Sequence, residues 1–171
     1  SRVLTVDGHP ERGQSPEEAA RLARYEALQS LVTDRSVVLV AQHLDDQAET
    51  ILLQLLRGSG LKGLSGMPAS TGFGAGVLHR PLLGVSRDSL RQYAERNGLT
   101  WLDDPSNQDT SYQRNYLRRE IIPRLKSRWP GMAKTLARAG RHCADAQQML
   151  NQQVNSWFDS VMVAERNTIR L

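Results

Sequence analysis

An apolar, β-branched run that leads directly into an acidic helix start is the feature that most constrains this fold. Residues 36–41 read Ser-Val-Val-Leu-Val-Ala, which is the pattern of a strand covered on both faces. A helix is predicted from about Asp45 to Arg57, with Gly58 as the residue that ends it. A strand followed at once by a helix is typical of α/β proteins. The apolar stripe of this helix is predicted to comprise Ile51, Leu52, Leu55 and Leu56.

The same alternation recurs along the first 110 residues. Short strands are predicted at residues 3–6, 77–80 and 99–102. Helices are predicted at residues 16–32 and 86–97, capped by Ser15 and Ser86. We therefore expect an α/β fold with a parallel, Rossmann-like sheet up to about residue 110. The buried stripe of the first helix is predicted to comprise Ala20, Ala23, Ala27 and Leu31, widened by Leu22 and Leu28.

The pattern is helical only from Tyr112 onward. Pro123 is expected to break or kink the first helix of this part, and Trp129 and Pro130 mark a junction. Residues 131–160 are then predicted to form one long helix. A domain boundary is predicted near residue 128, which divides the chain into residues 1–127 and an all-helical segment at residues 128–171.

Positive charge is concentrated in one block of the chain. Residues 112–142 carry nine Lys and Arg side chains against the single acid Glu120, a net charge of +8, although the whole chain has a net charge of only +4. Such a block is typical of a surface that binds a polyanion, and a solvated basic face is the alternative.

Composition excludes several classes of protein. No stretch approaches the roughly 20 apolar residues of a membrane span, and no signal peptide opens the sequence. Cys143 is the only cysteine, so neither an internal disulfide nor a four-thiolate metal site can form. A reducing, cytoplasmic location is expected.

The start of the second predicted helix carries the densest group of chemically active side chains. Asp45, Asp46 and Glu49 are three and four residues apart, so their carboxylates can converge around the first helical turn. Such a cluster suits Mg²⁺ or a substrate ammonium group, and His43 could bind phosphate or orient a carboxylate. The alternative is a capping box formed by Asp46 and Glu49.

Other candidates depend on weaker patterns. Arg57, Gly58, Ser59 and Gly60 could offer a guanidinium group and backbone N–H groups to an anion, or could simply end the helix. Arg80 ends an extended segment, and its side chain could point into the same crevice as the acidic helix start, beyond the ends of the predicted strands. The run Asp103 to Asn107 follows a predicted strand and is also a good turn sequence. Arg114 and Arg118, one turn apart, could bind phosphate.

Taken together, these motifs resemble the tRNA(Ile)-lysidine synthase family of the PP-loop ATP pyrophosphatases. The motifs are ARxxRY (20–25), HLDDQAET (43–50), RGSG (57–60), RPLL (80–83), DDPSN (103–107) and RNYLR (114–118). The resemblance implies a nucleotide-binding α/β domain followed by a helical tRNA-contacting domain. It implies that ATP adenylates ring carbon 2 of the wobble cytidine of a tRNA(Ile) precursor, after which the ε-amino group of free lysine displaces AMP to give lysidine.

The resemblance also implies roles for individual residues. Asp45, Asp46 and Glu49 would serve the lysine ammonium group and Mg²⁺, with Asp45 and Asp46 as the metal ligands, and Arg80 would lie near the reacting groups. His43 and residues 57–60 would lie by the nucleotide phosphates. The residues expected to contact tRNA are Arg114, Arg118, Arg119 and Arg124.

One departure from the family pattern concerns activity. The family's glycine-rich nucleotide loop is absent, and the chain contains no Gly-Gly pair. We therefore expect a fragment that begins after the first strand and helix of the domain, that is inactive by itself, and whose unpaired sheet edge favours self-association.

Three alternatives stay open at this point. A tRNA cytidine thiolase of the same superfamily would normally need a cysteine pair or an iron–sulfur cluster. A metal phosphohydrolase would need further histidine ligands. A non-enzymatic RNA-binding module would leave the acidic helix start without a purpose.

Overall fold

The computed structural model describes residues 3–10, 16–102, 104–163 and 168–169. The chain divides into two compact units. The first unit comprises Ser1–Ala41 and Pro68–Pro81, and the second comprises Gln42–Met67 and Leu82–Leu171. The small sheet belongs to the first unit and most of the helices belong to the second, which agrees with the predicted α/β fold followed by helices.

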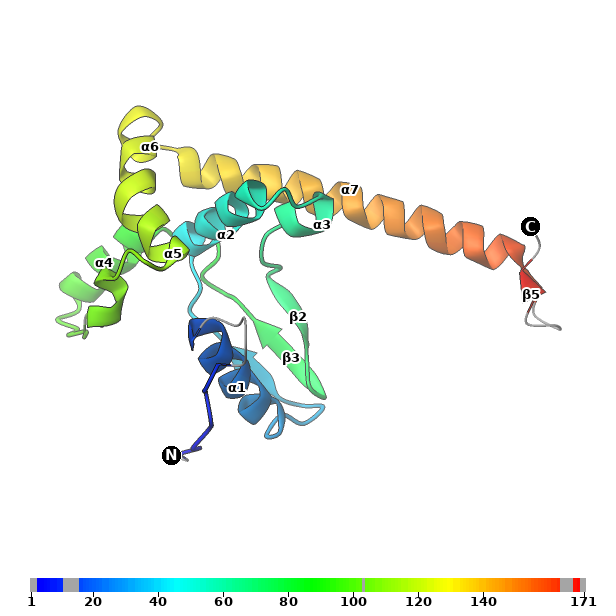
Figure 1. The fold of residues 1–171 in the computed structure, drawn as a ribbon, viewed down its shortest axis with the longest axis horizontal. Coiled ribbons are helices and arrows are strands. Elements are labelled where there is room, and N and C mark those ends of the chain that lie inside the picture. Colours follow the sequence, from blue (N-terminus) through cyan, green and yellow to red (C-terminus); the bar gives the residue numbers. More distant parts are fainter. Residues whose placement is uncertain (1–2, 11–15, 103, 164–167, 170–171) are drawn as a thin grey trace. The chain divides into compact units, whose positions relative to one another are not determined.

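A three-stranded mixed sheet and one helix form the first unit (Figure 1). Helix α1 spans Pro16–Gln29, and the strands are β1 (Val37–Leu39), β2 (Ser70–Phe73) and β3 (Gly76–His79). Their order is β1-β3-β2, with β1 parallel and β2 antiparallel to β3. The predicted parallel arrangement is confirmed for β1 and β3, whereas β2, which was not predicted, runs antiparallel because it forms a hairpin with β3 that turns at Gly74, whose φ is +58°.

Aromatic packing fills the centre of this unit. Phe73 and Leu78 are buried, and the ring of Tyr25 on α1 meets the ring of Phe73 edge-on at 5.6 Å. Gly76 allows a close backbone approach, since a Cβ atom there would lie 2.4 Å from the carbonyl oxygen of Ser36. The N–H group of Val77 next to it donates to the same carbonyl oxygen at 3.1 Å.

Several strand and helix predictions are wrong in this unit. Val37 and Leu39 are 61% and 67% exposed, so the β1 run is not covered on both faces; β1 pairs with β3 alone among the described strands. Residues 3–6 form no strand. Helix α1 ends at Gln29, and its most buried described residue is Ala19. Ala20, Leu22 and Leu31 are exposed, and the predicted cap Ser15 lies outside the described residues.

Helices make up most of the second unit. Their bounds are α2 (Leu44–Leu56), α3 (Leu61–Leu64), α4 (Arg87–Arg96), the 3₁₀ turn η1 (Pro105–Gln108), α5 (Gln113–Tyr116), the π-helical segment η2 (Leu117–Ile121), α6 (Ile122–Arg128) and α7 (Met132–Val161). Two short paired strands, β4 (Met162–Val163) and β5 (Thr168–Ile169), follow α7. The predicted cap of α4 is confirmed, with Ser86 at its start, and Gly98, whose φ is +62°, lies just beyond its end.

The core of this unit lies where α7 runs beside α2 and α3 (Figure 1). Its buried residues are Leu44, Ala48, Met132, Ala133 and Ala137. Gly140 permits the close approach, since a Cβ atom there would lie 2.8 Å from Cδ1 of Ile51. The single long helix predicted over residues 131–160 is confirmed.

Other predictions fail at the surface of this unit. Leu55 and Leu56 are 56% and 73% exposed, so the buried stripe of α2 ends near Leu52. Residues 99–102 form no strand. The predicted irregularity at Pro123 agrees with the structure: the π-helical segment η2 ends at Ile121, and Pro123 lies in the first turn of α6, where its missing N–H group is tolerated. No helix among the described residues is long and apolar enough to span a membrane.

Candidate active site

The N-terminus of α2 is closed by a reciprocal pair of hydrogen bonds. The His43 N–H group donates to Oδ2 of Asp46 at 3.0 Å, and the Asp46 N–H group donates to Nδ1 of His43 at 3.4 Å. A capping box therefore exists, but its members are His43 and Asp46, not Asp46 and Glu49 as the spacing had indicated. Glu49 is thereby left for another interaction.

Glu49 lies at the centre of a buried ion-pair cluster. Its side chain is 2% exposed, and it accepts two parallel hydrogen bonds from Arg118, from Nε to Oε1 and from Nη2 to Oε2, each at 2.8 Å. Nε of Arg114 donates to the same Oε2 at 2.8 Å. The hydrogen bonds to Glu49 raise the pKa of the Arg118 guanidinium group above its ordinary value, although burial opposes this. Arg118 is therefore charged, and both oxygens of the buried Glu49 carboxylate are paired with arginine side chains.

Asp46 links the helix cap to this cluster. Its Oδ1 lies 3.4 Å from Nη2 of Arg114 and 3.3 Å from Nη2 of Arg118. These contacts are longer than those to Glu49, and the Asp46 side chain is 15% exposed. Asp46 is consequently the more weakly held of these two carboxylates.

A change of helix type places the two arginines together. Arg114 belongs to α5 and Arg118 to the π-helical segment η2, in which Leu117 is buried. Residues four apart share one helix face, so the continuous helical run from α5 into η2 brings both guanidinium groups to Glu49. Single π-turns inside helices occur frequently at functional sites.

Asp45 takes part in a separate arrangement. Its Oδ1 accepts a hydrogen bond from Nζ of Lys126 on α6 at 2.6 Å, and its Oδ2 accepts one from the N–H group of Arg87, the first residue of α4, at 2.8 Å. Burial raises the pKa of Asp45, but the Arg87 N–H group and the Lys126 ammonium group together lower it below its ordinary value. Asp45 is therefore ionised at neutral pH and joins three helices.

The donor sets of these carboxylates do not fit a metal ion. Both oxygens of Asp45 and both oxygens of Asp46 already accept contacts from protein donors. No group of three or more His, Cys, Asp or Glu side chains in the described part of the chain is arranged to hold a metal. The Mg²⁺ ligands predicted at Asp45 and Asp46 thus receive no support from this geometry.

The remaining predicted site residues do not join the cluster. Nη2 of Arg57 lies 3.4 Å from Oε1 of Gln113, and Oγ of Ser59 lies 2.7 Å from Oε1 of Gln54. Gly58 has the positive φ expected after a helix, and Gly60 precedes the four-residue helix α3. A phosphate-binding role for residues 57–60 stays a prediction.

Arg80 belongs to the first unit, where its Nη1 donates to the carbonyl oxygen of Pro68 at 2.9 Å. Burial lowers the pKa of Arg80. Its predicted place near the reacting groups is untested. Asp103, at the start of the predicted turn, lies outside the described residues.

Two residues of this site were not anticipated from the sequence. Gln47 is buried and exchanges hydrogen bonds with the backbone of Met67, donating at 3.0 Å and accepting at 2.8 Å. Gly66 next to Met67 has a φ of +68°, and a Cβ atom there would lie 2.7 Å from Nε2 of Gln47. Lys126, which pairs with Asp45, is the second residue that was not anticipated. Neither has a sequence signal, because both contacts depend on how distant segments pack.

Comparison with known proteins places the chain in a class. Residues 1–125 match the PP-loop domain model, so the chain belongs to the PP-loop domain family. It is also 48% identical over 163 residues to the tRNA(Ile)-lysidine synthase of Methylococcus capsulatus, a match that covers 95% of this chain and 37% of that protein.

Other proteins of the same name give similar matches. The tRNA(Ile)-lysidine synthase of Pseudomonas aeruginosa is 56% identical over 138 residues, which cover 81% of this chain and 31% of that protein. The Coxiella burnetii protein is 47% identical over 156 residues, covering 91% and 34%. The chain therefore spans roughly a third of the length of these curated relatives.

Proposed function

We propose that this chain forms part of an enzyme that uses ATP to attach lysine to ring carbon 2 of the wobble cytidine in a tRNA(Ile) precursor. Membership of the PP-loop family supports ATP use, and relatives named tRNA(Ile)-lysidine synthase match 81–95% of the chain. The observation that carries the proposal is the cluster of Asp46, Glu49, Arg114 and Arg118, which HLDDQAET and RNYLR build together.

This proposal assigns different roles to the two parts of the chain. Residues 1–127 would belong to the ATP-using domain, and residues 128–171 would begin the helical part that contacts tRNA. The PP-loop match ends at residue 125, which supports a boundary at this position. Trp129 and Pro130 separate α6 from α7 there.

Asp46 is proposed to hold the lysine substrate by its positive charge, and Glu49 to fix the site around it. Glu49 is locked by three hydrogen bonds of 2.8 Å, so it fixes the two arginines and the shape of the site. Asp46, with longer contacts and some exposure, is the carboxylate that a substrate ammonium group can reach. Holding an amine beside an activated ring carbon supplies several kcal/mol of the barrier through positioning alone. His43, as the cap of α2, orients Asp46 and is proposed to lie by the nucleotide.

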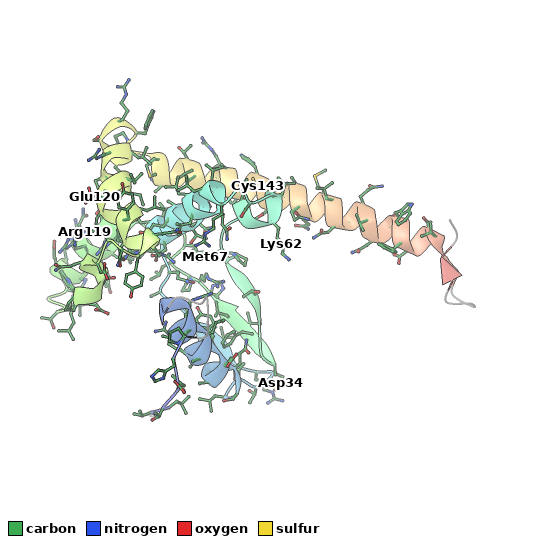
Figure 2. All side chains as sticks on the ribbon, viewed as in Figure 1. Asp34, Lys62, Met67, Arg119, Glu120 and Cys143 are labelled. Carbon is green, nitrogen blue, oxygen red and sulfur yellow. The ribbon has the colours of Figure 1, made fainter. Side chains whose placement is uncertain are left out.

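Exposed cations after residue 118 are proposed to contact the tRNA backbone. Arg114 and Arg118 were predicted to do so, but the structure engages both with Glu49. Arg119, labelled in Figure 2, and Arg124 are exposed, and Nη1 of Arg119 donates to the carbonyl oxygen of Gln108. The other exposed cations of the basic block are Arg128, Lys134, Arg138 and Arg141.

The salt dependence of tRNA binding tests this surface. In the full-length polypeptide that carries this sequence, replacing Arg119 and Arg124 by Ala should reduce the slope of log binding constant against log salt concentration by roughly one unit or less per lost phosphate contact. The matched control is Arg96→Ala on α4, an exposed arginine outside the basic block, which should leave the slope unchanged. An unchanged slope in the double variant would place the tRNA surface elsewhere.

The activity itself is tested by lysine dependence. The full-length polypeptide that carries this sequence, given ATP, Mg²⁺, lysine and a tRNA(Ile) precursor, should release AMP and pyrophosphate and form lysidine. Ornithine or arginine in place of lysine should give little product. Sulfur incorporation without any need for lysine would instead indicate a thiolase, and tRNA binding without ATP turnover would indicate a binding module.

A further inference from the structure

Lys126 brings to the start of α2 the same chemical group that a lysine substrate carries. Its Nζ lies 2.6 Å from Oδ1 of Asp45, while the N–H group of Arg87 lies 2.8 Å from Oδ2. Both oxygens of Asp45 are thereby engaged. The Asp45 side chain is 10% exposed and that of Lys126 is 34% exposed, so the ammonium group pairs with a carboxylate that is largely buried.

Asp46, the next residue, is held differently. Its Oδ1 meets guanidinium groups at 3.3 and 3.4 Å, and its Oδ2 accepts the N–H group of His43 at 3.0 Å. Within the described part of the chain, its ion-pair partners are thus arginine and histidine side chains, not a lysine. Two adjacent carboxylates at one helix start therefore differ in whether a primary ammonium group already occupies them.

This difference matters for a substrate that carries two amino groups. Free lysine has an α-amino and an ε-amino group, and the reaction proposed above needs the ε-amino group without its proton and free to attack. A bare carboxylate beside the site would bind either ammonium group and would favour its protonated form, because an opposite charge raises the pKa of an amine. Lysine held there would be in the wrong place and the wrong protonation state.

We propose that Lys126 masks Asp45 from the lysine substrate, so that Asp46 alone binds one ammonium group of the substrate and the ε-amino group stays free to attack. The masking rests on the proposed function, since it concerns the lysine of that reaction. Lys126 contacts no reacting atom in this scheme and is a positioning residue. Asp45 correspondingly serves the fold, by joining α2 to α4 and α6, and does not bind substrate.

Steady-state kinetics of Lys126→Met test the proposal in the full-length polypeptide. Methionine keeps the unbranched stem and removes the charge. Unproductive binding at the uncovered Asp45 should lower kcat and the KM for lysine by the same factor, about five- to tenfold, and leave kcat/KM unchanged. The matched control is Lys62→Met on α3, an exposed lysine labelled in Figure 2, which should behave as the unaltered protein.

Two further variants separate masking from a structural role. Adding Asp45→Asn to Lys126→Met removes the uncovered charge and should restore both kcat and KM. Lys126→Arg keeps a cation and should preserve both values. A fall in kcat/KM, or a loss of folding, that Asp45→Asn does not repair would make Lys126 structural and overturn the proposal.

The outcomes also separate this inference from the proposed function. Unchanged lysine kinetics in Lys126→Met, with lysidine formed normally, would overturn the masking alone. If the unaltered polypeptide makes no lysidine, the proposed function fails and the masking fails with it.

Discussion

Glu49→Gln should lower the free energy of unfolding of the protein by about 3 kcal/mol, near the lower end of the range for breaking a buried ion pair from one side. Glutamine keeps the volume but loses the charge that two guanidinium groups face at 2.8 Å. The cost arises because Arg118 and Arg114 stay charged in a partly buried place. It is not larger because their side chains remain 24% and 32% exposed, which lets water replace part of the lost interaction.

Thermal or urea unfolding measures this effect, and α4 offers a matched control. Glu95 lies 3.8 Å from Arg91, with both side chains more than half exposed, so Glu95→Gln should change the stability by less than about 1 kcal/mol. Equal stabilities for the two variants would show that the cluster around Glu49 is no stronger than a surface ion pair.

Local signals predicted the helices of the second unit well. The caps of α4, the glycine after α2 and the length of α7 all follow from short-range chemistry, such as a serine hydroxyl group that accepts the N–H group of Ser89 at 3.1 Å. These signals are contained within a few residues, so one sequence is sufficient to find them.

Sheet structure was predicted less well, because pairing depends on distant segments. The β-branched run at residues 36–41 looks like a central strand, yet Val37 and Leu39 are exposed in β1, which pairs only with β3 among the described residues. The runs at residues 3–6 and 99–102 have strand composition and find no partner strand. Composition reports the tendency to be a strand, not the presence of a neighbour.

In the candidate site, too, features set by local spacing were predicted and contacts between distant segments were not. Clustering of His43, Asp45, Asp46 and Glu49 was apparent from their helical spacing. The spacing also placed Arg114 and Arg118 on one helix face but could not show which element that face meets. These arginines were therefore predicted to bind phosphate or tRNA, whereas in the structure they bind the Glu49 carboxylate. Lys126 was counted only as part of the basic block, because its contact with Asp45 joins residues 81 positions apart.

Asp46→Asn should reduce lysidine formation by about 100-fold or more while leaving the fold intact, because it removes a charge proposed to position the substrate. The amide oxygen of asparagine can still accept the hydrogen bond from the His43 N–H group. Altering a helix cap costs about 0.5–2 kcal/mol at most, which most domains survive. Lysine-dependent AMP release should therefore be lost, whereas the unfolding temperature should change little.

The control for this variant is Asp88→Asn, which removes an exposed acid from the first turn of α4. Both substitutions take a negative charge from the start of a helix, so any general effect on helix stability or on the net charge of the protein is shared. Asp88 is exposed whereas Asp46 is largely buried beside two arginines, so replacing Asp88 should leave turnover within about twofold, a change of less than 0.5 kcal/mol in the barrier. Near-normal turnover in Asp46→Asn would remove Asp46 from the proposed lysine site. Glu49, enclosed by Arg114 and Arg118, would then have to bind the substrate by giving up one of those hydrogen bonds.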